Sequence, residues 1–283
     1  MTLVAILIGT LIAGIGSVWL AAALSFGLMA KYTQHMLSLA AGALLATAFM
    51  HLLPEAFESQ ASAHALFTAL LVGLVFFFLL DKAELWHHGH EHGHGHDHGH
   101  AHSHGAVTPH EPHDAGHQSA VPPQRTSTVQ PTKRSGGWAV LAGDSVHCFG
   151  DGILIASAFM ADIRLGMVAS LAVLAHEVPH HMGDLAVLRQ TSSNARAAIV
   201  KVSLAGAVTA LGGVVGYALV DQLYDFLPFF LIIASSSFMY VALADLIPQL
   251  QKRASIAETA AQIAWLLIGI GLVALISNFA HSH

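Results

Sequence analysis

Residues 64–82 read HALFTALLVGLVFFFLLDK, a run with no charged side chain before its last two residues. A helix of about 20 apolar residues crosses the roughly 30 Å hydrocarbon core of a bilayer. Comparable runs recur along the chain, so the sequence predicts an all-α integral membrane protein with eight transmembrane helices, at 3–25, 34–57, 64–82, 138–160, 165–189, 197–220, 226–250 and 258–279.

The composition favours lipid as the surrounding medium. Hydrophobic residues make up 54% of the chain and charged residues 10%, whereas a soluble domain carries about 25% charged residues. We therefore expect the lipid bilayer as a partner, and the net charge of −6 argues against a nucleic-acid partner. The single cysteine, Cys148, excludes an intrachain disulfide. The first apolar run has no basic residues before it, so we expect a retained span rather than a secretory signal.

The basic residues predict the orientation. Cytoplasmic loops of membrane proteins are enriched in Lys and Arg. With both termini outside, only Arg164 of the 11 basic residues lies outside. We expect this orientation, in a bacterial inner (plasma) membrane. The inside group comprises Lys31, Lys82, Arg125, Lys133, Arg134, Arg189, Arg196, Lys201, Lys252 and Arg253.

The segment 86–137 is the long polar part of the chain. Histidines alternate in it with Gly, Ala, Asp and Ser, followed by a stretch rich in Pro, Ser, Thr and Gln. Such a composition cannot bury a core, so we expect a disordered cytoplasmic loop between helices 1–3 (1–85) and helices 4–8 (138–283) of one membrane domain. Imidazole is a common metal ligand, so the loop either collects metal ions or is a low-complexity linker.

Two apolar segments resemble each other. Residues 49–55 read FMHLLPE and residues 243–249 read LADLIPQ, and small residues precede both, at 40–42 and 235–237. The two segments run in opposite directions through the membrane in the predicted topology. This pattern is typical of an inverted repeat, here helices 1–3 against helices 6–8 around helices 4 and 5. A chance similarity of two apolar helices is the alternative.

Helices 4 and 5 carry most of the ionisable residues inside the spans. A charge at the bilayer centre costs about 2.5–3.5 kcal/mol, so a helix retains one where it faces protein, water or an ion. On each helix the polar residues share an arc of about 100°, and facing arcs would present imidazole and carboxylate ligands at one depth. This predicts a metal site, with a polar network that ties the helices together as the alternative. The two sets are Asp144, His147, Cys148 and Asp151, and His176, Glu177, His180 and Asp184.

Polar groups at other depths extend this site into a transport pathway. His51 and Glu55 lie toward the outer face in the predicted topology, although both could be interfacial groups. Asp144, Asp184 and Asp245 lie toward the cytoplasm. His181 lies off the main stripe of helix 5 and is an uncertain ligand.

The two polar helices resemble those of the ZIP family of metal transporters, in particular its LIV-1-like branch. That family carries His-Asn-x-x-Asp-Gly on its fourth helix and His-Glu-x-Pro-His-Glu on its fifth, and here residues 147–152 read HCFGDG and 176–181 read HEVPHH. The resemblance covers nearly the whole chain. It implies uptake of a divalent metal into the cytoplasm by alternating access, through a binuclear centre. The implied first site comprises His147, Asp151, His176 and His180, and the second comprises Cys148, Asp151, Glu177 and His180.

The sequence departs from the family pattern at two positions. Cys148 replaces Asn, and His181 replaces the second Glu. A soft sulfur ligand favours zinc or cadmium over manganese or iron. We expect Zn²⁺ as the substrate, leave Cd²⁺, Fe²⁺ and Mn²⁺ open, and expect no organic cofactor. The sequence also leaves a homodimer open.

Two other functions share some of these features. His176-Glu177-x-x-His180 fits an intramembrane zinc metalloprotease, in which both histidines bind one zinc ion and Glu is the base. A cation-diffusion-facilitator exporter shares histidine-rich loops and His-x-x-x-Asp pairs, but has about six spans and a folded C-terminal domain. We expect a transporter and no enzyme.

Overall fold

A computed structural model describes residues 1–25, 33–89, 136–191, 194–251 and 255–281. These residues form eight helical segments and no strand. Three segments contain a wide π-helical turn, and one begins with a short 3-10 turn. The segments are α1 (Thr2–Leu11), η1 (Ile12–Gly16) and α2 (Ser17–Ser25); α3 (Thr33–Thr47), η3 (Ala48–Leu52) and α4 (Leu53–Phe57); α5 (Ala63–Gly89); α6 (Gly136–Ala161); α7 (Ile163–Thr191); α8 (Ala195–Gln222); η5 (Tyr224–Phe226), α9 (Leu227–Tyr240), η6 (Val241–Leu246) and α10 (Ile247–Leu250); and α11 (Ile256–His281).

Polar residues cap several of these helices at their first turn. Asp162 accepts hydrogen bonds from the backbone N–H groups of Arg164 and Leu165, at 2.7 and 3.3 Å, where α7 begins. Asn194 caps α8 in the same way. At the start of α11, Ser255 and Glu258 each accept a hydrogen bond from the other's backbone N–H, which is a capping box.

Apolar run length locates the helices closely, with one exception. The ends of the segments lie within two residues of the predicted spans, except that α5 continues to Gly89, seven residues past the predicted end at 82. Residues 86–89 therefore belong to α5, and Gly136 and Gly137 belong to α6, not to the predicted loop. Residues 90–135, with most of the histidines, lie outside the described residues, and their predicted disorder stays a prediction.

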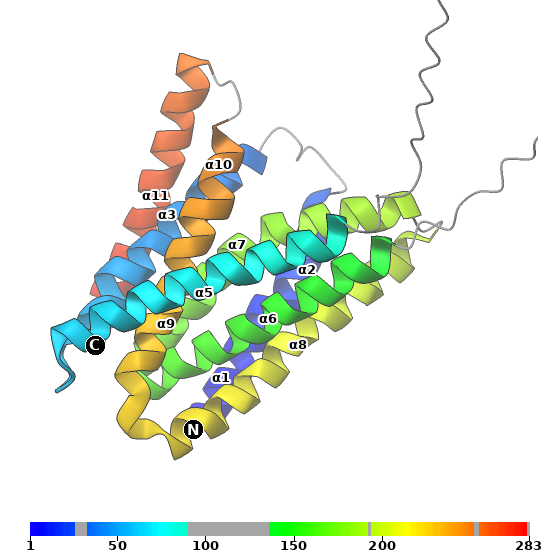
Figure 1. Ribbon diagram of the computed structural model, residues 1–283. Helices are drawn as coiled ribbons and strands as arrows, with labels where there is room; N and C mark the ends of the chain where they lie inside the picture. The colour runs from blue at the N-terminus through cyan, green and yellow to red at the C-terminus, as the bar shows by residue number, and fades with distance from the viewer. Residues whose placement is uncertain (26–32, 90–135, 192–193, 252–254, 282–283) are drawn as a thin grey trace, which may run out of the picture.

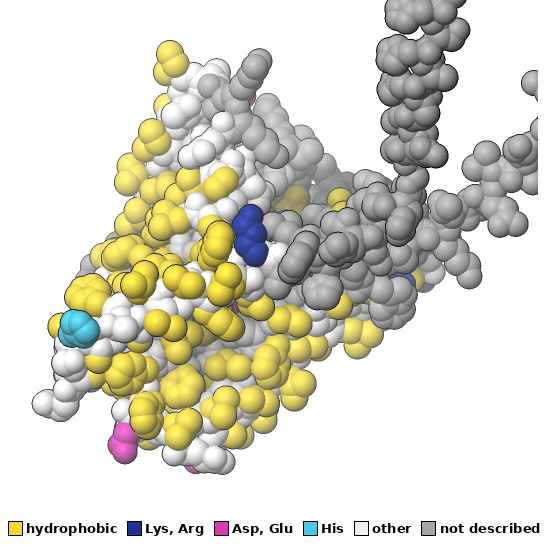
Figure 2. Space-filling model, viewed as in Figure 1, with side chains coloured by type: hydrophobic (Ala, Val, Ile, Leu, Met, Phe, Trp, Pro, Cys, Tyr) yellow, Lys and Arg dark blue, Asp and Glu magenta, His cyan; other side chains and the backbone are white. Residues whose placement is uncertain are grey.

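The protein is an all-α integral membrane protein. Six of the eight helical segments are long and apolar enough to cross a membrane. The other two are α6 and α7, which contain 26 and 29 residues and carry the ionisable side chains. Hydrophobic side chains cover most of the described surface on the face in Figure 2. Leu71 and Leu204, for example, are 62% and 66% exposed, as suits a surface in contact with lipid.

The helices form two tightly packed groups (Figure 1). In one, α3 lies beside α11; in the other, α6 lies between α7 and α8. Glycines allow the close approaches: an added Cβ on Gly212 of α8 would lie 2.9 Å from the carbonyl carbon of Phe149 in α6 and closer still to its oxygen. Gly42 approaches the backbone of Leu266 in the same manner, between α3 and α11. These contacts fix the position of α6 against α8 and hence of the polar residues that α6 carries.

The π-helical turns were not predicted, although two of them have a visible cause. Each of η3 and η6 ends two residues before a proline, Pro54 or Pro248, which is the second residue of the α-helical turn that follows. A proline ring clashes with the carbonyl four residues earlier, which here is that of Met50 or Ala244 within the wide turn. The turn widens to make room for the ring, and the helix continues.

Candidate metal centre

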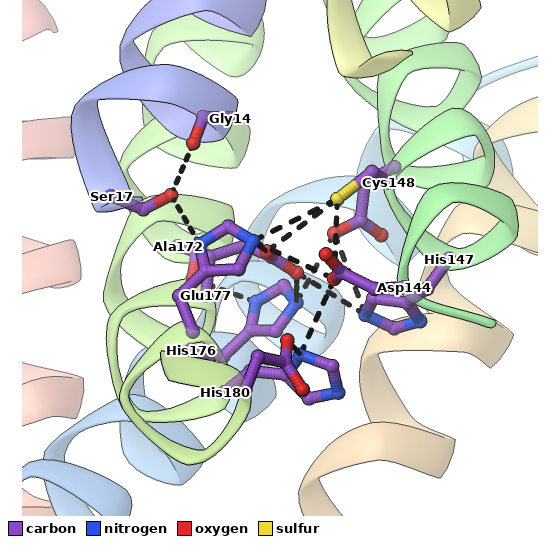
Figure 3. A network of polar contacts seen from close by, with 12 residues as sticks. Gly14, Ser17, Asp144, His147, Cys148, Ala172, His176, Glu177 and His180 are labelled. Carbon is purple, nitrogen blue, oxygen red and sulfur yellow. Dashed lines mark hydrogen bonds and ion pairs between the residues drawn. The ribbon is translucent and has the colours of Figure 1, made fainter. Parts of the chain in front are cut away.

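The polar stripes of α6 and α7 face each other near the middle of both helices (Figure 3). Because the helices are antiparallel, their register decides which side chains meet. Asp151 lies opposite His176, whereas Asp144 lies opposite His180 and His181. α7 passes through Pro179 as one helix, so all its polar residues keep a helical spacing.

The first group of ligand atoms comes from His147, Asp151, His176 and Glu177, all within 4.8 Å of one another. His176 Nε2 lies 3.2 Å from Asp151 Oδ2 and 3.3 Å from Glu177 Oε1. His147 Nε2 lies 3.3 Å from the same Glu177 oxygen. Two imidazoles and two carboxylates are a ligand set that suits a first-row divalent metal.

A second group joins Asp144, Cys148, Glu177 and His181. Cys148 Sγ lies 3.7 Å from Asp144 Oδ1 and 3.8 Å from Glu177 Oε2. His181 Nε2 lies 3.1 Å from Glu177 Oε2. Glu177 therefore faces both groups, with Oε1 toward the first and Oε2 toward the second.

A third group contains Asp144, His180 and Asp184. His180 Nδ1 lies 3.6 Å from Asp144 Oδ1 and 3.4 Å from Asp184 Oδ2. The His180 ring also stacks on that of His147, with 5.4 Å between ring centroids. His180 is the more open of these residues, with 39% of its side chain exposed.

Several buried atoms of this cluster make no hydrogen bond, although ion-pair partners lie nearby. Buried polar groups in proteins are almost always hydrogen-bonded, and buried charges are paired or bind metal ions. A set of carboxylates and imidazoles aimed at the same small volume is chemically suited to hold a divalent cation. The atoms are Asp144 Oδ2, His147 Nε2, Asp151 Oδ2, His176 Nε2, Glu177 Oε1 and Asp184 Oδ2.

These groups differ from the ligand sets that the family resemblance implies. His180 lies with Asp144 and Asp184 instead of in the first group. Asp144 and His181 take the places in the second group that the resemblance gives to Asp151 and His180. Asp144 lies close to Cys148, and hence in the second group, because it precedes Cys148 by one helical turn on the same face of α6.

A cavity of about 600 Å³ lies beside the first and third groups. His147, His176 and His180 line it at one side, and Asp245 lines it farther along, near the end of the η6–α10 segment. His51 and Glu55 belong to η3 and α4, and neither is part of the three ligand groups found among the described residues or of this cavity's lining.

Sequence reasoning did not identify two polar residues that line the cavity. Asp81 and Tyr240 both line it, and the Tyr240 hydroxyl donates a hydrogen bond to Asp81 Oδ2 at 3.0 Å. The one available signal was the position of Asp81 at the end of an apolar run, where a charged residue is ordinary. Tyr240 had no distinguishing signal.

The chain resembles known proteins along most of its length. Residues 1–277 match the protein family described as ZIP zinc transporter. Zinc transporter ZIP4 of Homo sapiens is 29% identical over 274 residues, which cover 85% of this chain and 41% of that protein. Zinc transporter foi of Drosophila melanogaster is 32% identical over 159 residues, 56% of this chain and 21% of that protein.

Zinc transporter ZIP10 of Danio rerio is 34% identical over 149 residues, which cover 50% of this chain. The chain spans less than half the length of each of these relatives, 41% in the case of human ZIP4 and 18% in the case of zebrafish ZIP10. The match to the family description, by contrast, runs over nearly all of this chain, and it includes both polar helices. The chain therefore belongs to the ZIP zinc transporter family.

Proposed function

We propose that this chain carries zinc across the membrane into the cytoplasm by alternating access. The observation that carries the proposal is the convergence of His147, Asp151, His176 and Glu177 from two adjacent helices beside a cavity. A metal carrier needs ligands that hold the ion in the membrane and a route by which the ion leaves. The zinc transporters among the relatives favour zinc as the substrate.

The position of the cavity supports release toward the cytoplasm. In the predicted orientation, the end of α10 lies on the cytoplasmic side, and the cavity runs from the first ligand group toward Asp245 near that end. His180 also lines this cavity, and its Nδ1 lies 3.4 Å from Asp184 Oδ2. We assign Asp144, His180, Asp184 and Asp245 to this exit. His51 and Glu55, at the opposite end of the bundle, would form the entrance.

The packing supports eight crossings and an inverted repeat of helices 1–3 and 6–8. Such a repeat relates α3 to α9 and α5 to α11. It also exchanges α6 with α7, and α8 with the first helical segment (α1, η1 and α2). The contacts follow this symmetry, since α3 packs on α11 as α9 packs on α5, and α6 packs on α8 as α7 packs on α2. The small residues repeat as well: Gly42 approaches α11, and Ser236 of α9 donates a hydrogen bond to the Leu70 carbonyl of α5 at 3.2 Å.

The arrangement gives little support to the metalloprotease alternative. In that chemistry both histidines of His-Glu-x-x-His bind one zinc ion. Among the described residues, His176 belongs to the first ligand group and His180 to the third, and no group contains both. We therefore assign both histidines to transport and propose no enzymatic activity.

Zinc uptake into proteoliposomes tests the proposal. His176→Ala and Asp151→Ala each remove one ligand of the first group, so we expect zinc flux to fall to the level of empty liposomes. His64→Ala and Asp221→Ala are matched controls, because both residues lie outside the ligand groups and are exposed at helix ends. Flux at the wild-type level in both ligand variants would refute the proposed site.

A further inference from the structure

We propose that the cavity beside the metal ligands holds one acyl chain of a phosphatidylethanolamine, which enters it from the bilayer between α5 and α6. The cavity volume is about 600 Å³, within the range of roughly 300–1,000 Å³ that is typical of sites for small molecules. The metal ligands line one side of this cavity only. The inference goes beyond the proposed transport, because lipid binding is measured without zinc flux.

Two apolar helix faces form another side of the cavity. On each helix the residues that line it recur at intervals of three or four, so they lie one above the other on one face. An apolar wall of this kind binds a hydrocarbon chain, whereas it gains nothing from a metal ion. The apolar wall consists of Phe76, Phe77 and Leu80 of α5 and Val146, Phe149 and Ile153 of α6.

The cavity opens toward the side of the bundle. Phe76 and Val146 both line it, yet 55% and 58% of their surfaces are exposed. Phe76 precedes Lys82 by six residues, or about 9 Å along the helix, and so lies at the depth of the hydrocarbon. α5 packs closely along α9 and touches α6 only lightly (Figure 1). Lipid therefore meets the open side, and a chain seated there separates the metal ligands from the bilayer.

Gly150 provides the space for this chain. It lines the cavity directly before Asp151, and an added Cβ would meet no atom within 4 Å. Gly152, by contrast, packs against the backbone of Thr209 and Gly213 in α8. A glycine inside a helix is destabilising relative to alanine. Close helix packing does not account for Gly150, whereas room for a ligand beside Asp151 does.

Adjacent opposite charges at the end of the apolar wall favour the ethanolamine head group. Asp81 lines the cavity and accepts a hydrogen bond from the Tyr240 hydroxyl at 3.0 Å. A carboxylate has about four lone-pair positions, so Asp81 can also accept from a primary ammonium group. Lys82, the next residue, is exposed, with Nζ 5.8 Å from the centroid of the Phe78 ring. The lipid ammonium group thus pairs with Asp81 and its phosphate with Lys82. The trimethylammonium group of phosphatidylcholine has no N–H to donate.

Photo-crosslinking of the purified full-length protein tests the inference. The probe is a phosphatidylethanolamine with a diazirine in one acyl chain, added at increasing mole fraction to phosphatidylcholine vesicles, and the crosslinked residues are mapped by mass spectrometry. We expect crosslinks to Phe149 and Ile153 that saturate and that unlabelled phosphatidylethanolamine displaces. Crosslinks to Leu71 and Val72, which are exposed on α5 outside the cavity, report bulk lipid and should rise linearly.

Gly150→Leu fills the cavity from within α6. Leucine is a better helix former than glycine and its Cβ meets no neighbour, so the variant should fold. Its side chain occupies the position of the acyl chain, and we expect the saturable crosslinks to fall on the order of tenfold, with those at Leu71 unchanged. Gly183→Leu is the matched control: Gly183 also directly precedes an aspartate of the ligand groups and has open space at its Cβ, but does not line the cavity.

Asp81→Asn tests the head group. It removes the charge that pairs with the lipid ammonium group, so the preference for phosphatidylethanolamine over phosphatidylcholine as a competitor should fall about threefold, as for an exposed ion pair. Asp221→Asn, an exposed aspartate at the opposite end of the bundle, should leave this preference unchanged.

Each contrary outcome has a defined meaning. Crosslinks to Phe149 and Ile153 that rise linearly, as at Leu71, would overturn the lipid site. So would equal saturable crosslinking in Gly150→Leu and Gly183→Leu. Equal competition by the two lipids in the wild type would overturn the head-group assignment. Zinc flux is scored separately, since saturable crosslinks in a protein without flux would refute the proposed transport and leave the lipid site standing.

Discussion

Gly212→Ala should impair metal binding although Gly212 contacts no ligand. The new Cβ would lie 2.9 Å from the carbonyl carbon of Phe149, and ordinary contact begins at 3.4 Å, so α6 and α8 must separate by at least about 0.5 Å. Phe149 lies directly after His147 and Cys148 in α6. Metal–ligand distances tolerate about 0.2 Å. The required shift exceeds this tolerance, so we expect the affinity for zinc to fall on the order of tenfold.

The same substitution should destabilise the protein. Overpacking costs about 1–3 kcal/mol, against a gain of about 0.5–1 kcal/mol from replacing a glycine inside a helix. Because the obstructing atoms are backbone, which cannot rotate away, we expect a net loss of about 2 kcal/mol. Gly271→Ala is the control: an added Cβ there meets nothing within 4 Å, so this variant should be slightly stabilised.

Equilibrium dialysis measures the zinc affinity of each variant. The apparent melting temperature in detergent measures its stability. Opposite changes in melting temperature for the two alanine variants, with weaker zinc binding in Gly212→Ala alone, are the expected result. Wild-type zinc affinity together with a raised melting temperature in Gly212→Ala would show that the α6–α8 contact does not position the ligands.

Three other predictions concern single features. Glu177→Gln keeps the side-chain volume and removes the carboxylate shared by both ligand groups, so the zinc affinity measured by equilibrium dialysis should fall, whereas Asp221→Asn should leave it unchanged; wild-type zinc affinity in Glu177→Gln would contradict its role as a ligand. Ser255→Ala removes half of the capping box of α11 and should cost about 1 kcal/mol, seen as a lower melting temperature; an unchanged value would argue against the cap. Deleting residues 87–117 should change the efficiency of zinc uptake by proteoliposomes but leave transport, and complete loss would give the histidine-rich segment an essential role.

The helices could be located from sequence because an apolar run is a local property of the chain. The end of α5 could not, since the apolar run marks where lipid ends and not where the helix ends. After Lys82 the sequence continues with strong helix formers, and the helix extends to Gly89. The wide turn η1 also gave no signal, because it contains no proline and depends on the packing of Gly14 against Gly206.

The polar residues of α6 and α7 could be selected from their helical spacing, but their grouping could not. Spacing along one helix says which side chains share a face. It does not give the register between two antiparallel helices, which places His180 opposite His147 and Asp144. Ser17 was beyond sequence reasoning for a different reason: a serine bonded to its own helix is common in membrane helices, and its contact with His181 joins residues 164 positions apart.

The two departures from the family pattern, Cys148 and His181, have a common location. Both face the second ligand group, whereas the first group consists of His147, Asp151, His176 and Glu177, which match the pattern. A sulfur in place of an amide, and an imidazole in place of a carboxylate, both exchange a harder donor for a softer one. Both side chains are buried and belong to one group of potential ligands, so the two changes alter the donor atoms of the same group in the same direction. The neutral imidazole also removes one negative charge from a group that already holds Asp144 and Glu177. This lowers the repulsion between the two buried carboxylates, while the hydrogen bond between His181 Nδ1 and the Ser17 hydroxyl, 2.9 Å long, holds the ring in place.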